Sequence, residues 1–202
     1  MVKMIETKKI KREIRILGFD DAAFEPNTAG ESVPVIGVVY RGGDFIDGML
    51  RTDITIDGMD STDKLIERIN STRHKQQIRV IMFDGITLGG FNIIDIHRLH
   101  EHTGLPVIVI ARKMPNLQEV QKALKNFEDY KIRWKLIEKA GEPKPCALKG
   151  GKKVYYQSVG LSDKKAEEII RLSSTRSFIP EPLRVAHLIA TAIVKGESSG
   201  RA

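Results

Sequence analysis

Acidic residues recur at the ends of apolar runs in this chain, and their types and spacing suit metal chemistry. Asp20 ends the run 15–20, Asp84 follows the run 79–83, and Asp60 and Asp63 stand at the start of a helical stretch between them. Carboxylates that converge repel one another unless a cation neutralises them, and hard Mg²⁺ or Mn²⁺ ions prefer oxygen ligands. The chain nevertheless carries a net charge of +7. Acidic clusters in a basic protein favour a metal-dependent enzyme that acts on a polyanion, which indicates a nuclease.

The composition limits the class of protein. The 33 Lys and Arg residues against 26 Asp and Glu favour nucleic acid as a partner, although a Lys- and Glu-rich thermophile surface has the same balance. A length of 202 residues predicts one domain over 1–202, with loosely ordered tails at 1–13 and 197–202. The single cysteine, Cys146, excludes an internal disulfide and favours a reducing, cytoplasmic setting. No apolar stretch approaches the roughly 18 residues of a membrane span, so no membrane partner is expected.

Strands and helices are expected to alternate along the chain. The predicted strands cover residues 15–20, 34–40, 45–56, 79–83, 105–111 and 154–159, with a hairpin turn at Gly42-Gly43. The predicted helices cover 61–71, 91–102, a long stretch after Asn116, 162–171 and 181–195, and 141–153 is expected to be loop. These elements predict an α/β fold, a mixed sheet with flanking helices. Such sheets bind ligands at the carboxyl ends of parallel strands, which is where Asp20 and Asp84 fall.

Four motifs resemble endonuclease V: Gly18-Phe19-Asp20, Asp63 near a helix start, Phe83-Asp84-Gly85, and Pro-Val-Ile-Val-Ile-Ala-Arg at 106–112. Two longer phrases, at 83–92 and 179–187, more closely resemble an archaeal sister family that is associated with endonuclease activity toward deoxyuridine. The resemblance covers roughly residues 15–194. It implies an endonuclease V-like domain with a ribonuclease H-like fold, and DNA repair by cutting at or near deaminated bases.

The resemblance also implies roles for individual residues. Asp20 and Asp84 match metal ligands, and Asp63 matches an intervening glutamate that lies 21 residues before the second aspartate; Asp60, one turn earlier, is a rival for that role. Arg112 matches a lysine that contacts phosphate. Lys113 and Arg184 are further candidates for holding the nucleic-acid backbone.

Departures from the family pattern matter as much. The metal-associated histidine of the last helix aligns with Leu183, which cannot ligate, and His187 lies one helical turn further on as a candidate replacement. The loop at 55–60 lacks the aromatic and proline residues with which endonuclease V opens its duplex. Base extrusion must therefore work differently here, or the substrate is already unpaired.

Two functions of different class compete. The first is a Mg²⁺- or Mn²⁺-dependent endonuclease acting at deoxyuridine or deoxyinosine, with DNA favoured over RNA. The second is a nucleic-acid-binding module that kept the fold and lost turnover, as the missing histidine suggests. The number of metal ions, the strandedness of the substrate and the oligomeric state are left open. A nucleotide-processing enzyme is disfavoured because the chain has no GxxxxGK[ST] or GxGxxG pattern.

A basic stretch near the middle of the chain is expected to be a solvated helix face. Its members are Lys122, Lys125, Lys131, Arg133, Lys135 and Lys139. Trp134 lies among them, with packing favoured over base stacking as its role.

Overall fold

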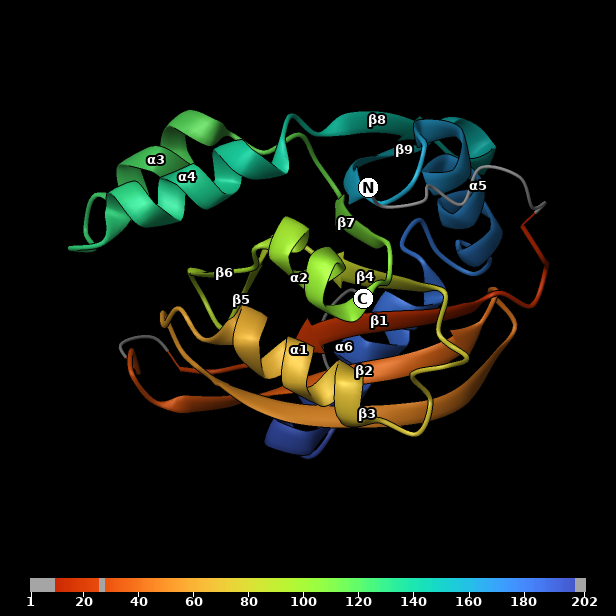
Figure 1. Ribbon diagram of the computed structural model, residues 1–202, viewed down its shortest axis with the longest axis horizontal. Helices are drawn as coiled ribbons and strands as arrows, with labels where there is room; N and C mark the ends of the chain where they lie inside the picture. Colours follow the sequence, from red (N-terminus) through yellow and green to blue (C-terminus); the bar gives the residue numbers. More distant parts are fainter. Residues whose placement is uncertain (1–9, 26–27, 199–202) are drawn as a thin grey trace.

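A mixed seven-stranded sheet forms the centre of the fold in the computed structural model, which describes residues 10–25 and 28–198 (Figure 1). In spatial order the strands are β3 (Phe45–Thr55), β2 (Ser32–Arg41), β1 (Arg15–Asp21), β4 (Val80–Asp84), β7 (Val107–Ala111), β9 (Lys153–Val159) and β8 (Lys144–Ala147). β1, β4 and β7 run parallel to one another, and the remaining neighbours are antiparallel. The three parallel strands therefore end on the same side of the molecule.

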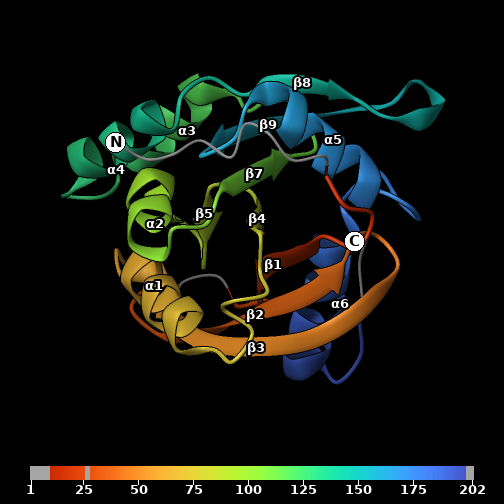
Figure 2. The same cartoon turned by 45° about the vertical axis from the view of Figure 1, so that its right-hand side comes forward.

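Helices cover both faces of this sheet. Figures 1 and 2 show α1 (Ser61–Ser71) and α2 (Ile96–Thr103) on one face, and α5 (Asp163–Ser173) and α6 (Glu181–Lys195) on the other. The parallel strands are buried on both faces, which explains why their sequences read as continuous apolar runs. Alternation along β1 and β4 directs Phe19 and Phe83 to the α1 face, where their rings stack with centroids 5.6 Å apart.

A third pair of helices projects from the end where β1, β4 and β7 finish. α3 (Leu117–Leu124) and α4 (Tyr130–Ala140) form a hairpin after β7, and the two-stranded β5 (Thr87–Leu88) and β6 (Asn92–Ile93) lie beside it (Figure 1). Leu124, Ile137 and Ile93 form a small apolar cluster that joins the two hairpins. No helix within residues 10–25 and 28–198 is long and apolar enough to cross a bilayer.

The helices predicted at 61–71 and 181–195 are confirmed at those bounds, and the six predicted strands are confirmed with ends shifted by at most two residues. The helix predicted at 91–102 was wrong at its start, because residues 92–93 pair in a hairpin and Asp95 caps the helix through the amides of His97 and Arg98. The predicted long helix after Asn116 is two helices, since the chain turns after Leu124 to fold α4 back onto α3.

The stretch predicted as loop at 141–153 contains β8 and a short 3₁₀ turn, η1 (Lys149–Gly151). β8 is the outermost strand, and an edge position tolerates Pro145 because its missing N–H faces away from the ladder. The predicted loose tails, 1–13 and 197–202, fall mostly on residues outside the described ranges.

Candidate active site

Asp20 and Asp84 lie side by side at the carboxyl ends of β1 and β4. The two strands are parallel, with Phe19 opposite Phe83, so the aspartates that follow these phenylalanines share the next position. Both point to the face that α6 covers, because side chains alternate along a strand. The side chain of Asp20 is 10% exposed, whereas that of Asp84 is 18% exposed. The predicted convergence of these two carboxylates is therefore present in the structure.

The surroundings of Asp20 disfavour its ionised form. Burial raises the pKa of Asp20 above its ordinary value, and the nearby charge of Asp84 raises it further. A hydrogen bond with His187 works in the opposite direction but does not cancel the effect of burial. A positive group placed between the two carboxylates would relieve this cost.

His187 reaches Asp20 from helix α6. Its Nδ1 lies 2.8 Å from Asp20 Oδ2. The hydrogen bond with Asp20 raises the pKa of His187, burial opposes that shift, and the charge of Asp20 adds to it. Leu183, one turn earlier, is fully buried in the core between α6 and the sheet. The last helix thus presents a histidine to Asp20 from a position four residues later than the resemblance to endonuclease V implies.

The sequence motif at residues 179–187 contains the start of α6 and the contacts that hold this helix against the sheet. Gly18 allows the close approach, because a Cβ atom at that position would lie 2.7 Å from the carbonyl carbon and Cβ of Pro182. Glu181 is buried at the helix start and accepts hydrogen bonds from the Arg184 guanidinium at 2.7 and 3.1 Å. Arg184 therefore braces the helix, although the sequence made it a candidate for binding phosphate.

Gly18→Ala is expected to push α6 away from β1 and separate His187 from Asp20. Overpacking of this kind costs about 1–3 kcal/mol of unfolding free energy, which denaturant titration would measure. NMR should show the pKa of His187 falling toward its ordinary value. Gly37→Ala is the matched control: its Cβ would meet the Phe19 ring, so it should lose stability without changing the His187 pKa. Equal pKa changes in both variants would contradict this role for Gly18.

Asp84 pairs with a positive side chain from the strand beside β4. Arg112 follows β7 directly, and its Nη2 lies 3.0 Å from Asp84 Oδ2. Lys113, the next residue, is exposed. Asp20 and Asp84 therefore lie between His187 on one side and Arg112 on the other, and both flanking groups can interact with an anion.

Asp60 and Asp63 have other partners in the structure. Asp60 accepts hydrogen bonds from the backbone and side chain of Thr55 and from the buried Asn92. Burial works to raise the pKa of Asp60, but these hydrogen bonds outweigh it and leave the pKa lowered. Asp63 is exposed and pairs with the Arg98 guanidinium of α2. Because α1 covers the face opposite α6, the structure does not bring either residue to Asp20 and Asp84.

The pair formed by His187 and Asp20 makes stability depend on pH. The pKa of His187 is raised above its ordinary value of about 6.5. Its contribution to stability is thus fully present below about pH 6.5 and is lost as the pH rises through the folded-state pKa. We expect the unfolding free energy of the metal-free protein, relative to His187→Asn, to fall across that window. A pH-independent difference between the two proteins would show that the pair is not formed in solution.

Comparison with known proteins identifies the family. A family model described as Endonuclease dU matches residues 12–194. The chain belongs to the endonuclease dU family. A UPF0215 protein of Methanosarcina mazei is 53% identical over 194 residues, covering 96% of this chain and 97% of that protein. A UPF0215 protein of Methanothermobacter thermautotrophicus is 50% identical over 196 residues, covering 96% and 95%. The predicted membership of an archaeal, endonuclease V-like family of nucleases is thereby confirmed.

Solved structures confirm the fold. A protein of unknown function from Archaeoglobus fulgidus is 40% identical, with a TM-score of 0.79 over 89% of this chain and 98% of that chain. Endonuclease V of Ciona intestinalis, solved with a 24mer DNA containing an inosine followed by a ribo-adenosine, is 15% identical with a TM-score of 0.60, covering 90% and 86%. Human ENDOV is 17% identical with a TM-score of 0.56, covering 90% and 84%. The fold predicted from the sequence, a mixed sheet like that of endonuclease V and ribonuclease H, is therefore confirmed.

Asp21 and Arg133 received no functional role from the sequence. Asp21 points to the opposite face from Asp20 and accepts a hydrogen bond from the Gly89 amide at 3.0 Å. Burial, followed by the charge of Asp20, raises the pKa of Asp21 to about 6. Arg133, predicted to lie on a solvated face, is instead 4% exposed. The adjacent Asp20 and Asp21 in the sequence could have drawn attention to Asp21. No local sequence pattern indicates that Arg133 is buried.

Proposed function

We propose that this chain is a metal-dependent endonuclease that hydrolyses phosphodiester bonds in DNA at or near deaminated bases. Deoxyuridine is the first candidate base and deoxyinosine the second, and the cellular role is DNA repair. The observation that carries the proposal is the buried Asp20 beside Asp84 at the ends of parallel strands, flanked by His187 and Arg112.

The carboxylates of Asp20 and Asp84 fit a Mg²⁺ or Mn²⁺ ion for which the protein supplies only some of the ligands. Among the described residues, no group of three or more His, Cys, Asp or Glu side chains is arranged to hold a metal. Mg²⁺ commonly takes one or two carboxylates and completes its shell with water and substrate phosphate. The unfavourable burial and like-charge repulsion at Asp20 are what such an ion would offset. When bound, it would neutralise phosphate charge and make water a better nucleophile.

The chain's own residues would orient the substrate and manage the proton. Arg112 and Lys113 stand where β7 ends and can hold phosphate oxygens next to Asp84. Asp20 fixes the imidazole of His187 through Nδ1, so that Nε2 is the atom that holds or releases a proton near the leaving oxygen. Each of these side chains is attached to a strand end or to helix α6, and the site is thus preorganised by the fold.

The comparisons support the substrate class. The family description names deoxyuridine, and the related Ciona structure is a complex with inosine-containing DNA. The net charge of +7 suits a DNA partner because bound cations are released when phosphates are neutralised.

Cleavage assays would test this proposal directly. Single- and double-stranded oligonucleotides containing deoxyuridine, deoxyinosine or neither would be incubated with Mg²⁺, Mn²⁺ or EDTA. We expect cutting that requires the lesion and the metal. Cutting that persists in EDTA, or that ignores the lesion, would refute the metal dependence or the specificity respectively.

A nucleic-acid-binding module without turnover is the second candidate. Leu183 at the family's histidine position and the pairing of Asp63 with Arg98 favour it, because both remove ligands from the site. Tight, salt-sensitive DNA binding with no cleavage under any metal would support this function instead.

A further inference from the structure

Arg133 of α4 is a buried cation, and three of its four hydrogen-bond partners lie outside its own helix hairpin. Its guanidinium donates hydrogen bonds to three backbone carbonyls: Asp57 O at 2.9 Å, Gly58 O at 3.1 Å and Phe91 O at 2.7 Å. Within the hairpin it pairs with Asp129 at 2.6 Å. A buried arginine is costly unless such partners satisfy it. One side chain therefore joins the α3–α4 hairpin to the β3–α1 loop and to the β5–β6 hairpin.

Aromatic rings complete this attachment. The guanidinium lies 4.4 Å from the ring centroid of Phe127, and the Phe127 and Phe91 rings are 5.5 Å apart. Arginine can bridge several acceptors and stack on a ring at once because its guanidinium is planar and carries five donors. Lysine cannot reproduce both contacts.

The loops that Arg133 holds are linked by consecutive hydrogen bonds to Asp21, the residue that follows Asp20 in β1. The Asp57 amide donates to Gly89 O at 2.8 Å, and the Gly89 amide donates to Asp21 beside Asp20. Asp57 has an unusual φ of +57°, and its carboxylate accepts from the Phe91 amide at 2.8 Å. A strained residue persists only when its surroundings determine it, and these contacts do so.

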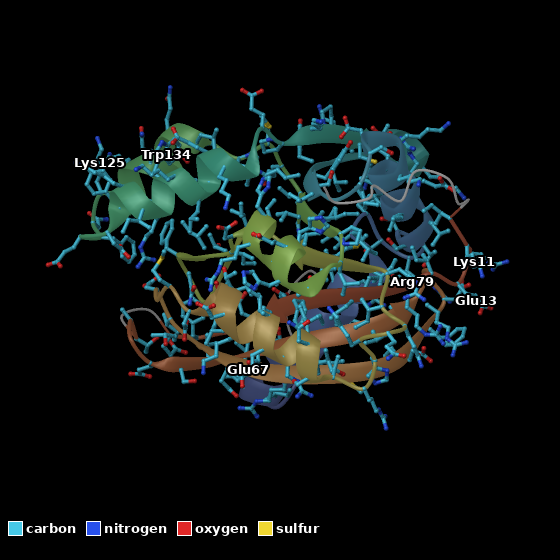
Figure 3. All side chains as sticks on the ribbon, viewed as in Figure 1. Lys11, Glu13, Glu67, Arg79, Lys125 and Trp134 are labelled. Carbon is cyan, nitrogen blue, oxygen red and sulfur yellow. The ribbon has the colours of Figure 1, made fainter. Side chains whose placement is uncertain are left out.

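These segments lie at the end of the sheet that carries the candidate site. The 85–90 segment follows Asp84 directly, and Figure 1 places the β5–β6 and α3–α4 hairpins at the end where β1 finishes. Met59, in the loop that Arg133 holds, is 37% exposed. Figure 3 shows Lys125 and Trp134 on the same hairpin, far from Arg79. Arg79 lines a separate cavity of about 430 Å³ that contains none of the candidate site residues.

We propose that Arg133 is a positioning residue for lesion recognition. It holds the 57–60 loop, the 85–91 segment and the α3–α4 hairpin as one surface, and that surface sets the preference for a lesion-bearing strand over an unmodified one. This role rests on the preference for deaminated bases in the proposed function, and not on cleavage itself. Without the guanidinium, three partly buried backbone carbonyls lose this donor and the surface loses its fixed shape.

The test compares Arg133→Lys and Arg133→Met with wild type. Arg171→Lys is the matched control, because Arg171 also pairs with a carboxylate four residues away and donates to a carbonyl, but it lies on α5. We expect the ratio of kcat/KM for deoxyuridine-containing DNA to that for unmodified DNA to fall about 10- to 100-fold in both Arg133 variants, mainly through KM. The control ratio and the His187 pKa should not change. Amide exchange at Gly89 and Phe91 should accelerate, and circular dichroism would confirm folding.

Binding separates this inference from the endonuclease proposal. Fluorescence anisotropy in EDTA would give the Kd of each protein for lesion-bearing and unmodified oligonucleotides, whether or not cleavage occurs. A folded Arg133→Lys protein that keeps the wild-type preference would overturn the positioning role while leaving the nuclease intact. Absence of any preference in wild type would also overturn it. Absence of cleavage with a preference that Arg133→Lys abolishes would refute the nuclease and retain the positioning role.

Discussion

Asp84→Asn is expected to lower lesion-dependent cleavage about 10²- to 10³-fold, the loss typical of removing one group that stabilises transition-state charge. The substitution keeps the size of the side chain but removes the charge that faces a metal ion, and Arg112 loses the carboxylate with which it pairs. Asp20→Asn should lose at least as much activity, because it also removes the partner of His187. Steady-state cleavage of a deoxyuridine oligonucleotide in Mg²⁺ and in Mn²⁺ would measure both effects.

Asp63→Asn is the informative comparison for these variants. Asp63 pairs with Arg98 at the surface, and exposed ion pairs contribute about 0–1 kcal/mol. We expect its cleavage rate to stay within about fivefold of wild type on that basis. DNA affinity should remain intact in Asp84→Asn, because phosphate binding depends on the basic side chains. A loss in Asp63→Asn as large as that in Asp84→Asn would mean that Asp63 leaves Arg98 to join the metal when substrate binds.

The convergence of Asp20 and Asp84 was predictable because it depends on a simple rule of topology. The two apolar runs that end in aspartate, β1 and β4, are parallel neighbours whose carboxyl ends coincide, although β2, β3 and α1 separate them along the chain. The candidacy of His187 was predictable for a similar reason, since helical periodicity places it on the same face as Leu183. Its contact with Asp20 then depends on how closely α6 approaches β1, which Gly18 decides.

Asp63 shows where spacing along the sequence stops being sufficient. Its position near the start of α1 was correct, but its direction depends on Arg98, which lies 35 residues later. The β5–β6 hairpin was missed for a related reason. Asn92 is held by Asp60, 32 residues away, and this contact overrides the helical pattern that continues into residues 96–103.

Arg133 could not be separated from its neighbours by composition or periodicity. It lies among lysines on an amphipathic helix, and only the tertiary structure brings the carbonyls of residues 57, 58 and 91 to it. Backbone acceptors leave no mark in the sequence, so a buried arginine that binds them resembles any exposed cation.

Arg184→Met is expected to lower the unfolding free energy by about 3 kcal/mol, because it leaves the buried Glu181 carboxylate without its partner. The estimate is at the low end for a broken buried pair, since the Arg184 side chain is 27% exposed. Denaturant unfolding near neutral pH would measure the loss. Arg171→Met should cost less than about 1 kcal/mol, because the pair of Arg171 with Glu167 is at the surface.

The double variant Glu181→Gln with Arg184→Met separates bracing from phosphate binding by Arg184. If Arg184 braces α6, removing the buried charge together with its partner restores part of the lost stability, with a coupling energy of about 1–3 kcal/mol. The KM for DNA in the folded single variant should then stay close to wild type. A KM that rises more than tenfold while stability is unchanged would instead favour phosphate binding by Arg184. The Arg184 guanidinium already has an anionic partner, because it donates hydrogen bonds of 2.7 and 3.1 Å to Glu181.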